Sequence, residues 1–177
     1  ILHDGSKFLM WYEANATAPG VATGDYVRIA YAESTDGRVW RKSGWVLAPG
    51  TSTYDRLDIY APVVIKDGPI WKMWFTGHDE AGRFGVMHAT APGPSGPWTR
   101  SSSAFVFHPS DSTFPSQVWK EGADLFMTYG SIDGMWLAKM VNDVWIPQKN
   151  ISARRTTGAW DHGEPGSWPS IAIKDGI

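Results

Sequence analysis

The stretch YAPVVIKDGPIWKMWFTG, residues 60–77, decides the fold that we expect, because parts of it recur along the chain. It is typical of two short apolar strands around an Asp-Gly turn. Partial copies occur at residues 1–14 (ILHDGSKFLMWYEA), 114–131 (FPSQVWKEGADLFMTYGS) and 168–177 (WPSIAIKDGI). The turn glycines Gly5, Gly68, Gly122 and Gly176 are 63, 54 and 54 residues apart. Repeats of this length indicate a repeat architecture.

Each copy continues with a further apolar segment, a turn and a tryptophan, which is Trp40, Trp98 or Trp145. The pattern predicts four antiparallel strands per unit, and units of about 50 residues bury their apolar faces by stacking as the blades of a β-propeller. We therefore expect an all-β chain with about three blade repeats, whose Trp and Met side chains fill the space between blades. The expected units span about residues 1–54, 55–110 and 111–163, and a further unit starts at 164–177.

The composition fits one globular domain and argues against several classes of partner. The chain has 177 residues, 42% hydrophobic, with 11 Trp and 19 Gly, which favours many short strands. It has no Cys, so disulfides are excluded. The net charge is −2 and the 16 basic residues are scattered, so we expect neither nucleic acid nor a membrane as a partner. We also expect no cofactor and no metal.

The repeated strand pair resembles the blades of the five-bladed propeller glycosidases, which are glycoside hydrolase families 43, 32 and 68 and the related family 130. The resemblance rests on the x-Pro-apolar-apolar-x-x-Asp-Gly strand followed by MWF-T-G or MWY, and it spans essentially the whole chain. In such blades, the segments leading into the first strands and the loops after the second strands face the ligand. Three repeats are too few to close a ring, so we expect missing sequence or a second chain that completes or seals it.

Residues 34–40, STDGRVW, come close to the Asp box of sialidase-type propellers, with one spacer missing because Asp36 and Gly37 are adjacent. The resemblance puts them between the third and fourth strands of a blade, on the side away from the ligand. We expect a turn whose Asp-Gly pair supplies the bend, with Trp40 as a packing anchor.

Cleavage of a glycosidic bond needs two carboxyl groups across it, one protonated and one ionised. Asp58 and Asp111 are the predicted ionised pair, because each lies three residues before the residue that precedes a proline in its repeat. Glu164 is the predicted proton donor, next to Trp160 and Trp168. The other residues predicted to bind sugar also belong to the ligand face: Tyr60, Phe114 and Trp168 as stacking platforms, with Arg56, His78, Asp79, Asp161 and His162.

The catalytic residues of the family do not carry over directly. In families 43 and 32 the carboxylates largely stand at or beside the residue before the inner-strand proline, where this chain has Ala61, Phe114 and Trp168. Two explanations stay open. In the first, the catalytic carboxylates stand at shifted positions and come from Asp58, Asp111, Glu164 or Asp161. In the second, the pocket binds sugar without cleaving it.

Three functions are therefore consistent with the sequence. The first is a glycosidase-type propeller that acts on or recognises a plant-like oligosaccharide, by acid/base hydrolysis if it is an enzyme. The second is a non-catalytic carbohydrate-binding propeller, and the third is a propeller scaffold for protein partners. The chain begins without Met and ends within a repeat, so we expect a fragment or a processed piece, from which a secretion signal could have been lost upstream.

Overall fold

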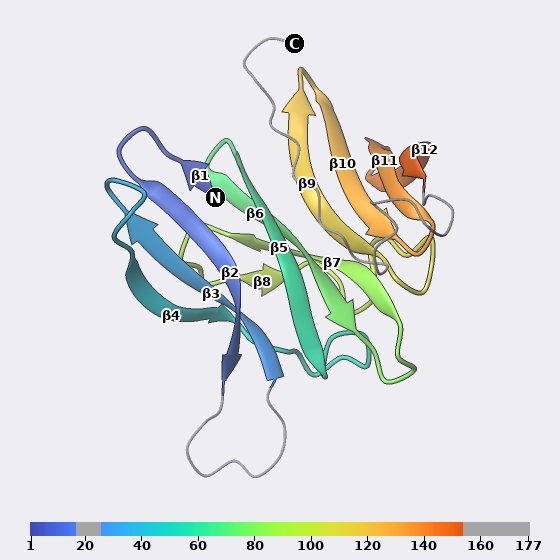
Figure 1. The fold of residues 1–177 in the computed structure, drawn as a ribbon, viewed down its shortest axis with the longest axis horizontal. Helices are drawn as coiled ribbons and strands as arrows, with labels where there is room; N and C mark the ends of the chain where they lie inside the picture. The colour runs from blue at the N-terminus through green and yellow to red at the C-terminus, as the bar shows by residue number, and fades with distance from the viewer. Residues whose placement is uncertain (17–25, 154–177) are drawn as a thin grey trace, which may run out of the picture.

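The structure is a computed structural model that describes residues 1–16 and 26–153 as three four-stranded antiparallel sheets (Figure 1). The sheets are consecutive along the chain and lie side by side, which confirms the predicted all-β propeller blades. Within the described residues no helix is long and apolar enough to cross a membrane. Blade 1 comprises β1 (Leu2–His3), β2 (Phe8–Ala16), β3 (Tyr26–Ser34) and β4 (Arg41–Leu47); blade 2 comprises β5 (Asp58–Asp67), β6 (Ile70–His78), β7 (Phe84–Ala91) and β8 (Thr99–Arg100); blade 3 comprises β9 (Phe114–Glu121), β10 (Asp124–Ser131), β11 (Gly134–Val141) and β12 (Val144–Ala153).

The turns that the repeat predicts join the first and second strand of each blade. Gly68 and Gly122 have φ of 60° in the turns that follow β5 and β9. This is the left-handed region, which glycine enters without the steric penalty of a Cβ atom. The recurring glycine of the sequence therefore marks a backbone requirement, and the chain reverses there in each blade.

The STDGRVW stretch forms the connection between β3 and β4. The Gly37 N–H donates to Ser34 Oγ at 2.9 Å, and Asp36 Oδ1 accepts two further N–H groups of the turn at 2.8 and 2.9 Å. A Cβ atom on Gly37 would lie 3.6 Å from the Phe8 ring, so this turn adjoins the one between β1 and β2. Trp40 is half-buried and donates from Nε1 to the Gly37 carbonyl at 3.2 Å. The stretch is a self-bonded hairpin turn.

Large side chains fill the two spaces between blades, as the repeat predicts. Between blades 1 and 2, the ring centroids of Trp11 and Trp71 are 5.6 Å apart. Between blades 2 and 3, those of Trp74 and Trp145 are 5.8 Å apart with the planes at 78°. All four side chains are buried, and each interface carries its own apolar cluster. Contacts between aromatic rings of this kind stabilise a pair by about 0.5–1.5 kcal/mol beyond area burial.

The methionines that keep step with the repeat do not all have the same surroundings. Met73 and Met127 are fully buried between blades, whereas Met10 is half-buried. Successive side chains of a strand point to opposite faces. Because Leu9 and Trp11 belong to the core between blades 1 and 2, Met10 faces away from it.

The inner strands β1, β5 and β9 line a cavity of about 270 Å³, whose walls include Leu2, Val64 and Val118. Both long inner strands are irregular where they contain proline. The β5–β6 ladder shifts register between Tyr60 and Val63, and the β9–β10 ladder shifts opposite Thr128 and Tyr129. Proline has no N–H to donate to a ladder, which favours such bulges, and bulges are over-represented next to active sites.

Acid is expected to destabilise the protein partly through His88 on β7. Its ring centroid is 4.8 Å from that of Trp74, and burial, with a smaller contribution from the Lys72 charge, lowers the pKa of His88 to about 4. As pH falls, the unfolded chain therefore protonates this histidine before the folded chain does. The stabilisation that His88 contributes to the folded state is complete above pH 6.5 and is lost as pH falls toward 4, which lowers the free energy of unfolding by about 1–3 kcal/mol.

The variant His88→Gln removes this titration, so we expect a flatter dependence of the unfolding free energy on pH between 6.5 and 4. Urea unfolding at several pH values measures it. The matched control is His3→Gln, which replaces an exposed histidine by the same residue. Equal slopes for His88→Gln and the parent protein would contradict the prediction.

Candidate functional site

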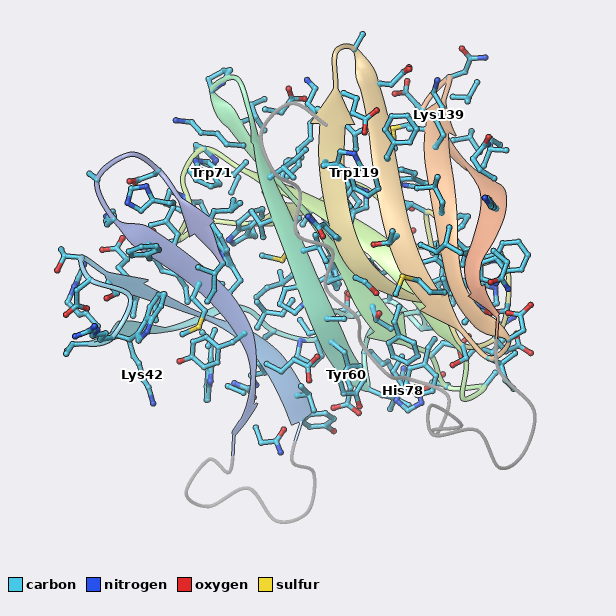
Figure 2. All side chains as sticks on the ribbon, turned by 45° about the horizontal axis from the view of Figure 1, so that its top comes forward. Lys42, Tyr60, Trp71, His78, Trp119 and Lys139 are labelled. Carbon is cyan, nitrogen blue, oxygen red and sulfur yellow. The ribbon has the colours of Figure 1, made fainter. Side chains whose placement is uncertain are left out.

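One end of blade 2 carries a row of polar and aromatic side chains across three neighbouring strands. In the ladders Asp58 is the partner of His78, and His78 is in turn the partner of Phe84. Residues directly opposite each other in adjacent strands have neighbouring side chains. Figure 2 shows Tyr60 and His78 together at this end of the sheets, with Trp71 and Trp119 toward the other end. The ladder register thus gathers an acid, an imidazole and a phenyl ring.

Asp58 is held from two blades. Its Oδ1 accepts a hydrogen bond from the Val27 N–H of β3 at 2.7 Å, and its Oδ2 lies 3.5 Å from His78 Nδ1. The Tyr60 hydroxyl, two residues along the same strand face, also hydrogen-bonds to Asp58. The Asp58 side chain keeps 20% of its surface exposed. It is fixed in position and still open to a ligand.

The electrostatic surroundings of Tyr60 identify a second carboxylate nearby. Burial raises the pKa of Tyr60 well above its usual value, and the hydrogen bond and charge of Asp58 raise it further. The charge of Glu13 acts in the same direction. Tyr60 is therefore a neutral hydroxyl at any physiological pH.

Aromatic rings continue from this cluster into blade 3. The centroids of His78 and Phe84 are 4.3 Å apart with planes at 14°, and those of Phe84 and Phe114 are 5.2 Å apart with planes at 28°. The Tyr60 ring is 6.1 Å from that of Phe84. All four residues are half-buried. They make a stacked aromatic row that links the starts of β5 and β9, next to Asp58.

The structure brings four of the predicted site residues into this one cluster: Asp58, Tyr60, His78 and Phe114. Arg56 lies close by, where its guanidinium forms an ion pair with the exposed Glu80 in the loop after β6. The residues Glu164, Trp168, Asp161 and His162 lie outside the described residues. Their roles stay predictions.

Asp79 has another function in the structure. Its Oδ1 accepts the N–H groups of Ala81 and Arg83 at 2.9 and 2.8 Å, and its Oδ2 takes two bonds from the Arg83 guanidinium at 2.7 Å each. Burial would raise the pKa of Asp79, but these bonds lower it below its usual range. Four bonds fill the acceptor positions of a carboxylate. Asp79 therefore shapes the loop between β6 and β7, and no position is left for a sugar hydroxyl.

Asp111 lies beside the cluster with its side chain in solvent. Its backbone carbonyl accepts the Phe84 N–H at 3.0 Å. Its carboxylate is 80% exposed and lies 3.5 Å from His108 Nε2. Within residues 1–16 and 26–153, no contact joins the Asp111 and Asp58 carboxylates. The sequence spacing puts both residues near the start of equivalent strands, Asp58 as the first residue of β5 and Asp111 before β9, but it does not determine where an exposed side chain points.

Among the members of the cluster, Glu13 was expected on the ligand face but was assigned no role from the sequence, and Phe84 was not predicted at all. Glu13 Oε1 accepts the Ala61 N–H at 2.7 Å, directly before the inner-strand Pro62. The alternation of β2 contains a signal for Glu13, since it lies two residues beyond the buried Trp11 on the same strand face. Phe84 has no such signal, because its place depends on how β7 pairs with β6.

The comparisons with known proteins give a fold and a distant relative. No protein-family model matches the chain. An uncharacterised protein of Mycobacterium tuberculosis, found in two strains, is 34% identical over 76 residues. That match covers 42% of this chain and 25% of the relative, so the chain spans about a quarter of the length of the protein that it matches.

Solved structures of glycosidases superpose on most of the chain. Fructan 1-exohydrolase IIa from Cichorium intybus has a TM-score of 0.66 at 20% identity, over 82% of this chain and 30% of that one. A family 117 glycoside hydrolase from Zobellia galactanivorans has 0.63 at 17% identity, over 83% and 53%. An α-L-arabinofuranosidase from Clostridium thermocellum has 0.61 at 16% identity, over 88% and 55%. Over its three described blades, the chain therefore has the fold of the five-bladed β-propeller glycosidases.

Proposed function

We propose that the protein is a carbohydrate-active propeller of the glycoside hydrolase type, which acts on oligosaccharides at the cluster around Asp58. The observation that carries the proposal is the Asp58, Tyr60 and His78 row at the end of the β5–β6 ladder, next to the aromatic rings of Phe84 and Phe114. Carboxylates and hydroxyls bind sugar hydroxyl groups, and aromatic surfaces pack on the C–H faces of sugar rings.

Structures of the same fold support a sugar as the ligand. One neighbour is a fructan 1-exohydrolase in complex with 1-kestose, and others are an α-L-arabinofuranosidase and a sucrose-6-phosphate hydrolase from Lactobacillus gasseri. The chain covers 30%, 55% and 31% of those chains, respectively. We take a neutral fructo- or arabino-oligosaccharide as the first substrate class to test.

For hydrolysis, the glycosidic C–O bond breaks, the departing oxygen takes a proton, and water supplies the oxygen of the new C–O bond. Asp58 would serve as the ionised group, because the Val27 N–H and the Tyr60 hydroxyl both donate to it. Asp111 and Glu164 stay as the predicted second ionised group and proton donor. Arg56, which is paired with Glu80, stays as a predicted contact at the rim.

A non-catalytic sugar-binding propeller is the second candidate. The observation in its favour is that Ala61 and Phe114 occupy the positions before the inner-strand prolines. A binding module uses the same Asp58 and aromatic row but needs no proton donor. It predicts saturable binding without product.

The test is a panel of neutral fructo-, arabino- and xylo-oligosaccharides, with binding measured by calorimetry and products by chromatography after long incubation. We expect at least one sugar to bind at millimolar concentration or below and to release a shorter product. Binding with no product would replace the enzyme by the binding module. If no sugar of the panel binds, the proposed function is wrong.

A further inference from the structure

We propose that Glu13 is a sugar-binding residue of this site, where it and Asp58 both accept hydroxyl groups of a neutral sugar beside Tyr60. The inference rests on the proposed function and adds to it a residue from blade 1. Three observations carry it: Glu13 lies on the face of β2 that packs on blade 2, it accepts the Ala61 N–H, and no described Lys or Arg forms an ion pair with Glu13 or Asp58.

The position of Glu13 follows from strand geometry. Leu9 and Trp11 alternate along β2 and are buried against blade 2. Glu13 continues the same alternation, so its side chain also faces blade 2, although it is exposed. Glu13 therefore continues the face of β2 that Leu9 and Trp11 occupy, at the point where this face passes from the core to solvent.

The bond to Ala61 fixes one oxygen of the carboxylate. Ala61 has φ of 49°, an uncommon conformation for a residue other than glycine, and it stands at the bulge of β5. Its N–H therefore turns from the β5–β6 ladder to Glu13 Oε1, at 2.7 Å. Strained backbone of this kind persists where the surroundings hold it and is concentrated at functional sites. Within residues 1–16 and 26–153, Glu13 Oε2 takes no hydrogen bond.

Glu13 and Asp58 both contact β5 next to Tyr60. Asp58 hydrogen-bonds to the Tyr60 hydroxyl, and Glu13 accepts the N–H of Ala61, the residue that follows Tyr60. The two acids come from different blades, β2 of blade 1 and β5 of blade 2. The residue before Pro62 is Ala61, which has no carboxylate. Glu13 of blade 1 thus supplies a carboxylate at this position through its bond with the Ala61 N–H.

The charges around the site favour a neutral ligand. Arg56 is paired with Glu80 and Arg83 with Asp79, and the Arg28 guanidinium, next to Val27 on β3, lies over the Trp45 ring at 4.0 Å from its centroid. Among the described residues, no Lys or Arg forms an ion pair with Glu13 or Asp58. An anionic sugar would meet two like charges, whereas a neutral sugar donates its hydroxyl groups to them.

The test uses Glu13→Gln in the full chain, because the amide oxygen can still accept the Ala61 N–H while the charge is lost. The probes are the best-binding neutral oligosaccharide of the panel and an oligogalacturonate of similar length. We expect affinity for the neutral sugar to fall about tenfold and affinity for the oligogalacturonate to rise about threefold or more, because a like charge has been removed. A residue with only a structural role would not move the two affinities in opposite directions.

The matched control is Glu121→Gln, which changes the net charge equally. Glu121 ends β9 near the opposite end of the blades and accepts the Trp119 indole N–H at 2.9 Å. Equal affinities for Glu13→Gln and Glu121→Gln would overturn the inference, while neutral sugar binding would still support the proposed function. If the parent protein binds no neutral sugar, both the proposed function and the inference about Glu13 are wrong.

A second variant keeps the test decisive if Glu13→Gln lowers the melting temperature. Glu13→Asp retains the charge and shortens the side chain by one methylene. It should keep the discrimination against oligogalacturonate while it weakens neutral sugar binding. Tighter binding of oligogalacturonate by Glu13→Asp would overturn the inference.

Discussion

Replacing Asp58 by Asn is expected to lower the rate of glycoside hydrolysis by about 10²–10⁴-fold, the range typical of a lost catalytic acid or base. Asn has nearly the same shape and its oxygen can accept the Val27 N–H, which Asp58 accepts at 2.7 Å. It cannot carry the negative charge that an oxocarbenium-like transition state requires. The effect should appear in kcat, with a smaller change in KM, because the charge is used mainly in the transition state.

The measurement is the steady-state rate of product release from the best substrate of the oligosaccharide panel. Asp111→Asn is the parallel variant, since both residues are predicted from equivalent positions and the Asp111 side chain is 80% exposed. A loss in both variants supports the predicted carboxylate pair, and a loss in Asp58→Asn alone centres the chemistry on Asp58. If Asp58→Asn hydrolyses every substrate at the parent rate, Asp58 is not catalytic.

Replacing Arg100 by Met is expected to reduce the free energy of unfolding by about 3–5 kcal/mol, as for other buried ion pairs that lose one partner. Asp55 is fully buried, and one of its carboxylate oxygens accepts the Arg100 Nε–H. Its other oxygen, Oδ1, has no hydrogen bond among the described residues. The Arg100 guanidinium also donates to the Ala48 carbonyl at 2.6 Å, so it ties the loop between blades 1 and 2 to β8.

Urea unfolding at pH 7 measures the loss. The control Arg41→Met removes the exposed partner of Glu33 and should cost at most about 1 kcal/mol, because exposed ion pairs contribute little. The double variant Asp55→Asn with Arg100→Met should be more stable than Arg100→Met alone, because no unpaired charge stays buried. A loss in Arg100→Met no larger than in Arg41→Met would contradict the prediction.

The fold could be predicted from sequence because its signals are local and periodic. The Asp-Gly type turn recurs with Gly68 and Gly122, both at φ of 60°, and the strands on either side alternate. Residues such as Met73 and Met127 repeat at the same phase, so one packing environment recurs from blade to blade. The surroundings of Met10 could not be predicted from that phase alone, because they depend on which face of β2 meets blade 2.

Only those residues of the candidate site whose place follows from their position along a strand could be predicted. Tyr60 and Asp58 could be placed at this end of the blades because they lie at the start of an inner strand. The role of Asp79 was missed, because four local hydrogen bonds use its carboxylate to shape a loop. Loop conformation depends on such competing bonds, and spacing along the chain does not reveal which of them form.

The sequence by itself determined the class of fold, the blade repeat and the turns, because hydrophobic alternation and glycine backbone preference act within a few residues. Only the tertiary structure decided which side chains meet. The register of the β5–β6 ladder places His78 opposite Asp58, and the packing of blade 1 on blade 2 brings Glu13 to the Ala61 N–H. The two residues of that last contact are 48 positions apart. Contacts across blades depend on how whole sheets pack, which no short stretch of the chain encodes.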